Sequence, residues 1–388
     1  MTNKIIIKDI LNGIKKISGN KKVFLHEPYF FNEDFKSIEK CLKTTQVSSH
    51  SQYVKKFEKK LCSYTRAKYS VATINGTSAL HLSLLAIGVK SNDEIVIPNY
   101  NYIAPANAVL YCNAKPIFID VELETYGLDP FKFKEFLEQS CFTKNKKTFN
   151  KKTKKQIKAV VVTHVYGNPC RIEPIINIAK KYNLKIIEDA SEALGSFYKS
   201  KHLGTFGDIG VLSFNGNKII TTGGGGAAIT NDKKLFDKFM LIATIAKTKN
   251  SFWDYKELGY NFRMPGLNAA LGISQLNNIS FIKKKKKELF NAYYKEFLNN
   301  ENFKIVEPIS ENSNNWLVSL WLKKSSHNLI DSIVKTCIKN NFNVRPGWKI
   351  MTKIPHFKKY KFNKESNSII VEKSLICLPS SWHIMNKK

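Results

Sequence analysis

The amino-acid sequence predicts an α/β protein with a mainly parallel sheet of seven strands, flanked by helices, and a smaller α+β part after it. Short apolar runs alternate with helix-length stretches, and most of these runs are apolar at nearly every position, which is typical of strands covered on both faces. The predicted strands are residues 70–75, 94–98, 116–121, 159–165, 184–190, 208–214 and 225–231. Because ligands in such sheets bind beyond the carboxyl ends of strands, we expect functional residues to follow these runs.

Three parts are expected along the 388-residue chain: a helical extension at 1–22, a large domain at 23–265 and a small C-terminal domain at 266–388. The length is sufficient for a large core and two lobes. Residues 140–157 are rich in Lys, Asn and Thr and contain few apolar positions. This composition predicts a surface insertion.

The formal net charge of +31 raises the question of nucleic-acid binding, since basic surfaces attract phosphate backbones. The excess is mostly lysine in dispersed runs, such as residues 144–147, 151–155 and 283–287, and no zinc finger or RNA-recognition sequence accompanies it. We therefore expect solvated basic faces and no nucleic-acid partner. Attraction of an anionic substrate would be a benefit of this charge.

The seven cysteines are scattered and never spaced C-x-x-C, which predicts reduced thiols rather than disulfides or a metal site. No apolar run approaches the length of a bilayer span, and charge interrupts the first apolar run too early for a signal peptide. We expect a cytoplasmic protein without a membrane segment.

Lys218 stands between the runs 208–214 and 225–231, with the four glycines 223–226 close behind it. At a strand exit, an ammonium that loses hydration becomes an amine nucleophile and a general base, which is the chemistry of a Schiff-base lysine. The glycines would let backbone approach a ligand closely. The alternative interpretations are that Lys218 is an ordinary surface lysine and that the four glycines form the corner of a β-hairpin. A dinucleotide fingerprint does not fit, because a strand rather than a helix follows the glycines.

Two further strand exits carry groups suited to pyridoxal phosphate. Gly76, Thr77 and Ser78 open a helix after the first strand, where free amides and hydroxyls form an anion site for a phosphate. Asp189 ends the run 184–190, and a carboxylate there can keep a pyridine nitrogen protonated. The ordinary alternatives are that Thr77 and Ser78 only cap the helix and that Asp189 is a turn residue at the end of its strand. The neighbouring Glu188 is expected to be structural.

Tyr102 and Ser213 extend this pattern. Tyr100 and Tyr102 follow the run 94–98, and one of the two can stack on the cofactor ring, with core packing as the alternative. Ser213 precedes Lys218 by five residues and can add a phosphate contact. None of these signals is specific alone, but together, each at a strand exit, they predict one cofactor site.

With these residues in view, the sequence resembles the DegT/DnrJ/EryC1/StrS sugar aminotransferase family, of aspartate-aminotransferase-like fold type I, from residue 23 to about 381. Within that family it looks most like the LegC type, through the uninterrupted segment 213–226, the run 345–348 and the short N-terminal extension. The motifs that carry the resemblance are residues 75–80, 114–120, 164–167, 188–190, 213–218, 259–264 and 378–380.

The resemblance implies that Lys218 holds pyridoxal phosphate covalently and that Asp189 pairs with its pyridinium nitrogen. It implies that Tyr102 stands where the family usually has a stacking Phe. It further implies a homodimer with shared active sites, in which Asn261 reaches across from a second subunit. The residues expected at the phosphate are Gly76, Thr77, Ser78, Ser213 and Asn261.

In one place the chain departs from the family pattern. Where many members have Gln three residues after the aspartate, to contact the ring hydroxyl of the cofactor, this chain has Glu192. A carboxylate there would repel a phenolate unless one of the two is protonated. The expected substrate-binding residues are His164, Arg263, Arg345 and Trp348, with both arginines as candidates for the carboxylate of the amino donor.

The implied activity is transfer of the amino group of L-glutamate to C4 of a UDP- or GDP-linked 4-keto-6-deoxy-N-acetylhexosamine, for legionaminic acid-like or bacillosamine-like sugars and surface polysaccharide. A 3-aminotransferase and a sugar 3-dehydratase are alternatives within the family, although dehydratases carry His in place of the lysine. From another class, a non-catalytic pyridoxal phosphate-binding regulator with a basic surface for nucleic acid remains an alternative.

Overall fold

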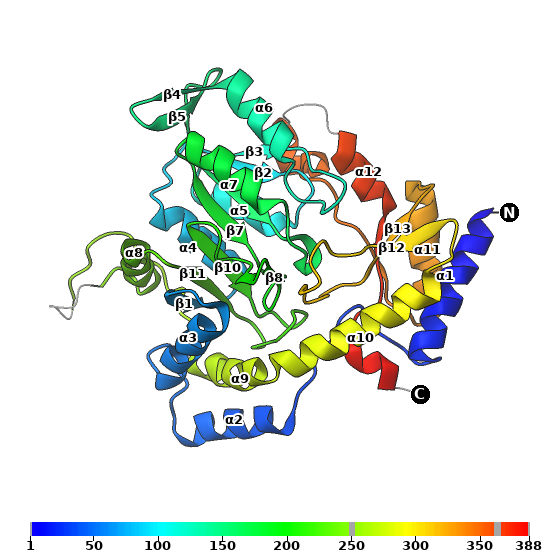
Figure 1. Cartoon of the computed structure of the whole chain (residues 1–388). Coiled ribbons are helices and arrows are strands. Elements are labelled where there is room, and N and C mark those ends of the chain that lie inside the picture. The colour runs from blue at the N-terminus through cyan, green and yellow to red at the C-terminus, as the bar shows by residue number, and fades with distance from the viewer. Residues whose placement is uncertain (1, 248–252, 361–365, 387–388) are drawn as a thin grey trace.

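The computed structural model describes residues 2–247, 253–360 and 366–386, and these form a large mixed sheet with helices on both faces and a smaller sheet at one end (Figure 1). The main path of the large sheet runs in the order β1-β11-β10-β7-β6-β2-β3. All seven predicted strands are present. Their bounds are β1 (Tyr69–Thr73), β2 (Glu94–Pro98), β3 (Lys115–Ile119), β6 (Gln156–Thr163), β7 (Lys185–Asp189), β10 (Ile209–Ser213) and β11 (Gly226–Thr230).

Strands β10, β7, β6, β2 and β3 pair in parallel, whereas β11 is antiparallel to both β1 and β10. Two layers of helices cover the sheet because successive strand residues face opposite ways. Val211 of β10 packs with one layer and Leu212 with the other. The first layer contains α4 (Gly76–Ala86), α5 (Ile103–Tyr111) and α8 (Lys233–Ala243), and the second contains α3 (Gln52–Thr65), α6 (Pro130–Ser140), α7 (Ile172–Lys181) and α9 (Gly266–Asn277).

The predicted surface insertion at residues 140–157 is mostly exposed, and it contains a β-hairpin that joins the sheet, so the sheet of the described residues has nine strands rather than seven. Strands β4 (Cys141–Lys144) and β5 (Lys147–Asn150) pair with each other, and β5 pairs with the start of β6. The turn residues Asn145 and Lys146 have positive φ angles, as two-residue hairpin turns require. These two strands were not predicted because the segment has few apolar residues and therefore shows no apolar strand pattern.

The C-terminal part contains a four-stranded sheet in the order β12-β13-β15-β14, covered by helices. Its elements are α10 (Ile279–Phe297), β12 (Phe303–Ile305), β13 (Ser319–Leu322), α11 (His327–Lys339), β14 (Arg345–Pro346), α12 (Ser366–Ser374) and β15 (Leu375–Cys377), with short 3-10 turns at Met351–Lys353, Pro355–Tyr360 and Trp382–Asn386. The remaining short elements of the chain are α2 (Asn32–Lys43), β8 (Phe197–Tyr198), β9 (Lys201–His202) and the 3-10 turn Val165–Gly167.

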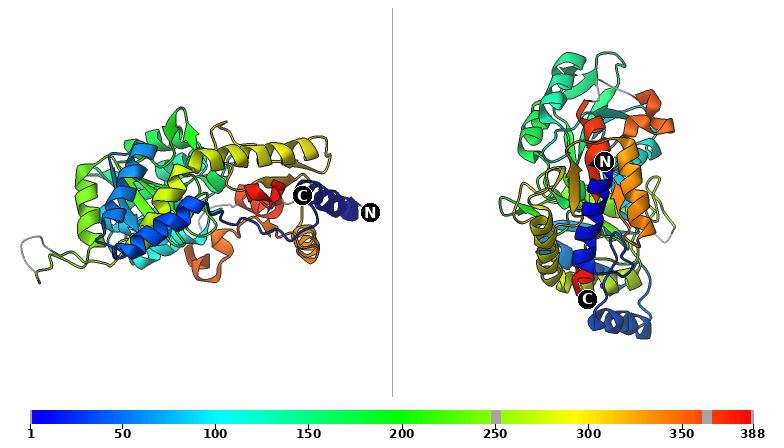
Figure 2. Two further views of the ribbon diagram at one scale, coloured as in Figure 1. Left: turned by 90° about the horizontal axis from the view of Figure 1, so that it is seen from below. Right: turned by 90° about the vertical axis from the view of Figure 1, so that its right-hand side faces the viewer.

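The packing differs from the predicted division of the chain at two points. Helix α1 (Thr2–Ser18) buries Ile6, Ile10 and Ile14 in the core of the C-terminal part, so the extension is an integral piece of that part (Figure 2). Helix α9, predicted to open the small domain, packs against α2 and α3 on the large domain. Residues 1, 248–252, 361–365, 387 and 388 of the predicted parts lie outside the described residues.

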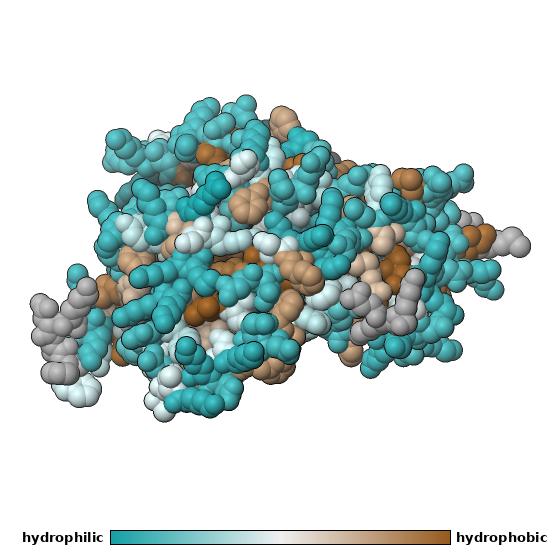
Figure 3. Space-filling model, turned by 60° about the horizontal axis from the view of Figure 1, so that its bottom comes forward, coloured by the Kyte–Doolittle hydropathy of each residue, from teal (hydrophilic) through white to brown (hydrophobic). Residues whose placement is uncertain are grey.

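The face of the molecule in Figure 3 is mostly hydrophilic, with apolar side chains in small separate groups. Among the helices that the structure describes, none combines the length and the apolar character needed to cross a bilayer.

Candidate active site

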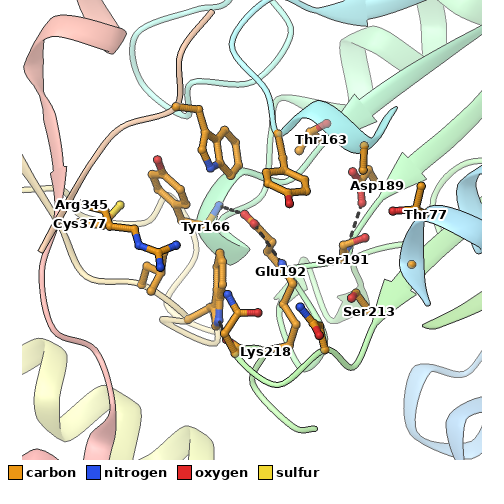
Figure 4. A pocket seen from close by; sticks show the side chains of 18 of the residues that line it. Thr77, Thr163, Tyr166, Asp189, Ser191, Glu192, Ser213, Lys218, Arg345 and Cys377 are labelled. Carbon is orange, nitrogen blue, oxygen red and sulfur yellow. Dashed lines mark hydrogen bonds and ion pairs between the residues drawn. The ribbon is translucent and has the colours of Figure 1, made fainter. Parts of the chain in front are cut away.

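A cavity of about 380 Å³ lies where β6, β7 and β10 end, at the edge of the sheet where a ligand is expected. These ends are adjacent because β7 pairs with both neighbours, which sets Thr163 opposite Asp189. The first turn of α4 and the loop after β10 form one side, and residues of the C-terminal part form the other. Figure 4 shows the side chains that meet there.

The amine of Lys218 lies inside this cavity, with 13% of its side chain exposed. Its Nζ donates to Glu192 Oε1 at 3.2 Å and lies 4.2 Å from the ring centroid of Trp316. Trp316 is fixed in turn, because its Nε1 donates to the Asn217 carbonyl at 2.7 Å. A carboxylate and an aromatic face both attract an ammonium, so these contacts hold the amine in one place.

Asp189 presents a carboxylate to the same cavity from the end of β7 and is 5% exposed. Burial raises its pKa, while hydrogen bonds from Ser191, whose backbone N–H donates to Oδ1 at 3.1 Å, and the charge of Lys218 act in the opposite direction. The hydroxyl of Thr163 beside it is buried without a hydrogen-bond partner in the described part of the chain. A desolvated acceptor next to an unsatisfied hydroxyl is an arrangement that a polar ligand would complete.

The first turn of α4 forms an anion cradle with two serines. A Cβ atom added to Gly76 would lie 3.0 Å from Ser213 Cβ and 3.4 Å from Ser191 Oγ, so only glycine lets these hydroxyls approach the helix end. Thr77 adds a third hydroxyl to the cavity wall. Helix N-termini favour anions through their free amides and the helix dipole. Ser78 is less available, since its amide already donates to Asn75 Oδ1 at 2.7 Å.

Glu192 is enclosed beside Lys218, with 7% of its side chain exposed. Its Oε2 accepts from the backbone N–H of Tyr166 at 2.9 Å. Burial raises the pKa of Glu192, and the nearby Lys218 charge acts against this rise. Tyr166 has a φ of 55°, an uncommon left-handed conformation that aims its N–H at the carboxylate. Glu192 is thus placed at the cavity wall with one oxygen on the Tyr166 amide and the other on the Lys218 amine.

Three further predicted residues stand at the mouth of the cavity. Tyr102 is 55% exposed, and its ring centroid lies 6.3 Å from that of Trp348. Trp348 packs on Tyr166 with a centroid distance of 4.8 Å. Arg345 completes this side of the cavity from β14. The mouth is therefore aromatic, with one guanidinium beside it.

Two predicted substrate-binding residues lie away from the cavity, and the structure corrects both assignments. No part of the His164 side chain is exposed, because Nε2 donates to Glu188 Oε2 at 2.9 Å and Nδ1 accepts from the Cys170 N–H at 3.2 Å. Arg263 forms an ion pair with Glu58 at 2.5 Å. His164 is therefore enclosed and Nη1 of Arg263 is occupied by Glu58, and neither side chain lines this cavity.

Asn261 is exposed beside Thr244 and does not line the cavity of its own chain. Several lining residues were not predicted, notably Thr163, Ser191, Asn217 and Trp316. Thr163 and Ser191 adjoin predicted strand ends and could have been found by the same signal. Trp316 could not, since it comes from the C-terminal part and no local pattern ties it to the sheet.

Comparisons with known proteins agree with this geometry. The model of the DegT/DnrJ/EryC1/StrS aminotransferase family matches residues 29–388. GDP-perosamine synthase of Escherichia coli O157:H7 is 38% identical over 275 residues, which are 71% of each chain. A UDP-4-amino-4,6-dideoxy-N-acetyl-beta-L-altrosamine transaminase of Campylobacter jejuni is 35% identical over 276 residues, which are 71% of this chain and 69% of that one.

Among solved structures, Helicobacter pylori PseC, an aminotransferase involved in the biosynthesis of pseudoaminic acid, superposes with a TM-score of 0.83 at 24% identity. The match covers 95% of this chain and 98% of that chain. This likeness confirms the predicted α/β architecture of fold type I aminotransferases. The protein belongs to the DegT/DnrJ/EryC1/StrS aminotransferase family, whose members depend on pyridoxal phosphate.

The residues of the cavity fit this cofactor. The hydroxyls around Gly76 suit a phosphate, the desolvated Asp189 suits a protonated ring nitrogen, and Lys218 supplies the amine. The unsatisfied hydroxyl of Thr163 next to Asp189 shows that the cavity holds polar groups without partners in the protein.

Proposed function

We propose that this chain is a LegC-type sugar 4-aminotransferase. It transfers the amino group of L-glutamate to C4 of a UDP- or GDP-linked 4-keto-6-deoxy-N-acetylhexosamine, for legionaminic acid-like or bacillosamine-like sugars of a surface polysaccharide, in the cytoplasm. The observation that carries the proposal is the meeting of Lys218, Asp189 and the cradle at Gly76 in one cavity. Two relatives carry a nucleoside diphosphate in their names, one GDP and one UDP, which supports a nucleotide-linked substrate.

Some residues of the cavity would bind the cofactor, and Lys218 would transfer protons. The hydroxyls of Thr77, Ser191 and Ser213 would hold the phosphate, and Asp189 would keep the pyridine nitrogen protonated. Bound pyridoxal phosphate supplies an electron sink and carries the amino group between two substrates. Lys218 Nζ would act as the base that takes the proton from the α-carbon of glutamate and passes it to the cofactor within the first half-reaction, and it would carry out the reverse transfer toward C4 of the sugar in the second. Ping-pong kinetics follow from this sequence.

Replacement of Lys218 by Ala tests the central assignment. The Lys218→Ala variant should lose the visible absorbance of the lysine-bound cofactor and all measurable turnover, because Lys218 is the only lysine among the described residues that line the cavity. The matched control is Lys335→Ala, an exposed lysine on α11, which should behave as wild type. A yellow, active Lys218→Ala protein would end the proposal.

The substrate is identified by incubation of the purified protein with L-glutamate and a panel of UDP- and GDP-linked 4-keto sugars. Products are read by mass spectrometry and NMR, which also give the position and stereochemistry of the new amine. A 3-amino product would favour the 3-aminotransferase, and loss of the 3-hydroxyl would favour the dehydratase. A protein that keeps the cofactor, shows no response to glutamate and binds DNA in a salt-sensitive manner would be a regulator instead.

We also propose that Asn261 serves the cavity of a second copy in a homodimer, which accounts for its exposed position away from its own cavity. Mixing an Asn261→Ala variant with Lys218→Ala tests this directly. Heterodimers regain one intact site, so the mixture should reach up to about a quarter of wild-type activity under random exchange. Activity no greater than that of the separate variants would contradict a shared site.

A further inference from the structure

Lys286 differs from the other lysines of the basic run 283–287, which was expected to be solvated. Its neighbours in this run are exposed or half-buried, whereas no part of Lys286 is exposed. Among the lysines that the structure describes, it is the only buried one. Because lysines are almost never fully buried without a partner, its place in the protein needs a physical reason.

The surroundings of Lys286 supply hydrogen-bond acceptors but no opposite charge. Its Nζ donates to the backbone carbonyls of Trp316 and Ser380. No carboxylate offsets its burial within the described parts of the chain, and burial lowers its pKa well below the ordinary value of 10.5. A desolvated amine without a carboxylate costs free energy of folding. The arrangement therefore provides a donor for two carbonyls rather than a stabilising ion pair.

Lys286 lies where helix α10 passes from one hydrophobic core to the other. About one turn before it, Ile282 packs in the core of the large domain, and about one turn after it, Leu289 packs in the core of the C-terminal part. Figure 1 shows α10 extending from α9 toward α1. A hydrogen bond made from this point attaches other segments to a helix that both cores hold.

Trp316 is the acceptor of Lys286 that also lines the cavity. Its backbone N–H donates to Asn314 Oδ1 at 2.9 Å, so its N–H and its carbonyl are both held by side chains. The second acceptor, Ser380, is joined to the same segment, because its Oγ accepts from the Val318 N–H at 2.9 Å. Lys286 thus holds the main chain that carries the Trp316 ring.

The Trp316 ring supports the amine of Lys218. Nζ lies 4.2 Å from the ring centroid, and only 4% of Trp316 is exposed. The rings of His26 and Tyr166 each lie at a centroid distance of 6.4 Å from it. An aromatic face attracts a desolvated ammonium, and this attraction depends on where the ring lies. A shift of the Trp316 main chain would therefore move the ring away from the amine.

We propose that Lys286 is a positioning residue of this active site, which holds the Trp316 carbonyl so that the indole stays against the amine of Lys218. This rests on the proposed role of Lys218 as the residue that binds the cofactor. Lys286 does not line the cavity, so it acts on the amine through Trp316. Its effect should disappear once the indole is removed.

The rate at which added pyridoxal phosphate forms the visible band of the lysine-bound cofactor measures how well the amine is placed. It is followed by absorbance in the cofactor-free, full-length protein. Trp316→Leu should slow this rate by about 5- to 30-fold, since it removes a desolvated cation–π contact. Lys286→Met keeps the length of the side chain but no donor, and should slow the rate by about 3- to 10-fold. Lys286→Arg, which keeps donors for both carbonyls, should stay within about 2-fold of wild type.

The matched control is Lys284→Met, an exposed lysine of the same helix, which should react at the wild-type rate. Lys286→Gln, which is neutral and shorter, is measured beside Lys286→Met. It gives the same comparison if Met lowers the melting temperature too far for the protein to fold. Either replacement of Lys286 should slow the reaction when Trp316 is present.

The double variant Lys286→Met, Trp316→Leu separates positioning from a general structural role. If Lys286 acts through the indole, the double variant should be less than about 2-fold slower than Trp316→Leu alone. Multiplied effects in the double variant, or a wild-type rate in a folded Lys286→Met protein, would overturn the proposal. A wild-type protein that forms no visible band with pyridoxal phosphate would instead count against the role of Lys218, and the positioning role would fall with it.

Discussion

Two buried acidic residues four positions apart, Glu188 and Glu192, are held in opposite ways. Glu188 lies behind the strand end with His164, and neither side chain is exposed. Its oxygens accept from three donors: His164 at 2.9 Å and the amides of Gly204 and Gly207 at 2.8 and 2.6 Å. Glu192 faces the cavity with Lys218 and accepts from two donors. One carboxylate is saturated within the protein, whereas the other borders space for a ligand.

The pKa shifts follow from this difference. Burial acts to raise the pKa of both carboxyls. At Glu188 the hydrogen bonds from His164, Gly207 and Gly204 outweigh burial and lower the pKa. At Glu192 burial outweighs the Lys218 charge and raises it. Equal burial therefore does not identify a functional acid. The number of donors that the fold itself supplies separates a structural carboxylate from one poised for chemistry.

The largest expected difference between Glu188 and Glu192 is in how much each contributes to the free energy of unfolding. Glu188→Gln places an amide N–H₂ where three donors converge, so it should lower the free energy of unfolding by about 2–4 kcal/mol. Glu192→Gln, with only two donors to satisfy and a carboxyl whose pKa is raised by burial, should change it by less than about 1 kcal/mol. Urea unfolding of the cofactor-free variants measures both.

Glu124→Gln serves as the control, because the Glu124–Arg171 pair is exposed and should contribute less than about 1 kcal/mol. Equal losses in Glu188→Gln and Glu192→Gln would break the distinction between the two carboxylates.

The same distinction explains what could be predicted from the sequence. Asp189 and Ser213 lie at the ends of predicted strands, and Thr77 and Lys218 follow such ends; a parallel sheet gathers these positions at one edge regardless of finer detail. Glu188 was expected to be structural, and its saturated, enclosed carboxylate agrees with that. His164 was misassigned because its motif also adjoins a strand end, and nothing in the local sequence shows that Glu188 and Cys170 occupy its ring.

The remaining errors concern contacts between distant segments. Trp316 reaches Lys218 only because the C-terminal part folds over the cavity. Helix α9 has the same local pattern whether it packs on one lobe or the other, so its attachment to α2 and α3 is decided by tertiary packing. The hairpin β4–β5 lies in the predicted surface insertion, and its two strands were not predicted because its composition is polar; they are defined by pairing with each other and with β6.

A smaller difference between Glu188 and Glu192 is expected in how the stability of the protein depends on pH. The pKa of Glu188 is lower in the folded protein than its ordinary value of 4.5, so its contribution to stability is complete above about pH 4.5 and is lost as pH falls through the folded pKa. The pKa of Glu192 is higher than 4.5, so its contribution is complete below about pH 4.5 and is lost as pH rises through the folded pKa. The two carboxyls should therefore pull the stability of wild type in opposite directions on either side of that pH.

Unfolding of the cofactor-free proteins across about pH 2 to 7 isolates the two contributions, since each Gln variant lacks one titrating group and the window reaches well below the ordinary glutamate pKa of 4.5. The deficit of Glu188→Gln relative to wild type should shrink as the solution is acidified, because wild type then loses what the variant never had. Glu192→Gln should gain on wild type as pH rises, because it no longer carries a carboxyl that must ionise in a desolvated place. Parallel pH profiles for the two variants would mean that both carboxyls are equally satisfied by the fold, and the cavity side of Glu192 would then need no ligand to complete it.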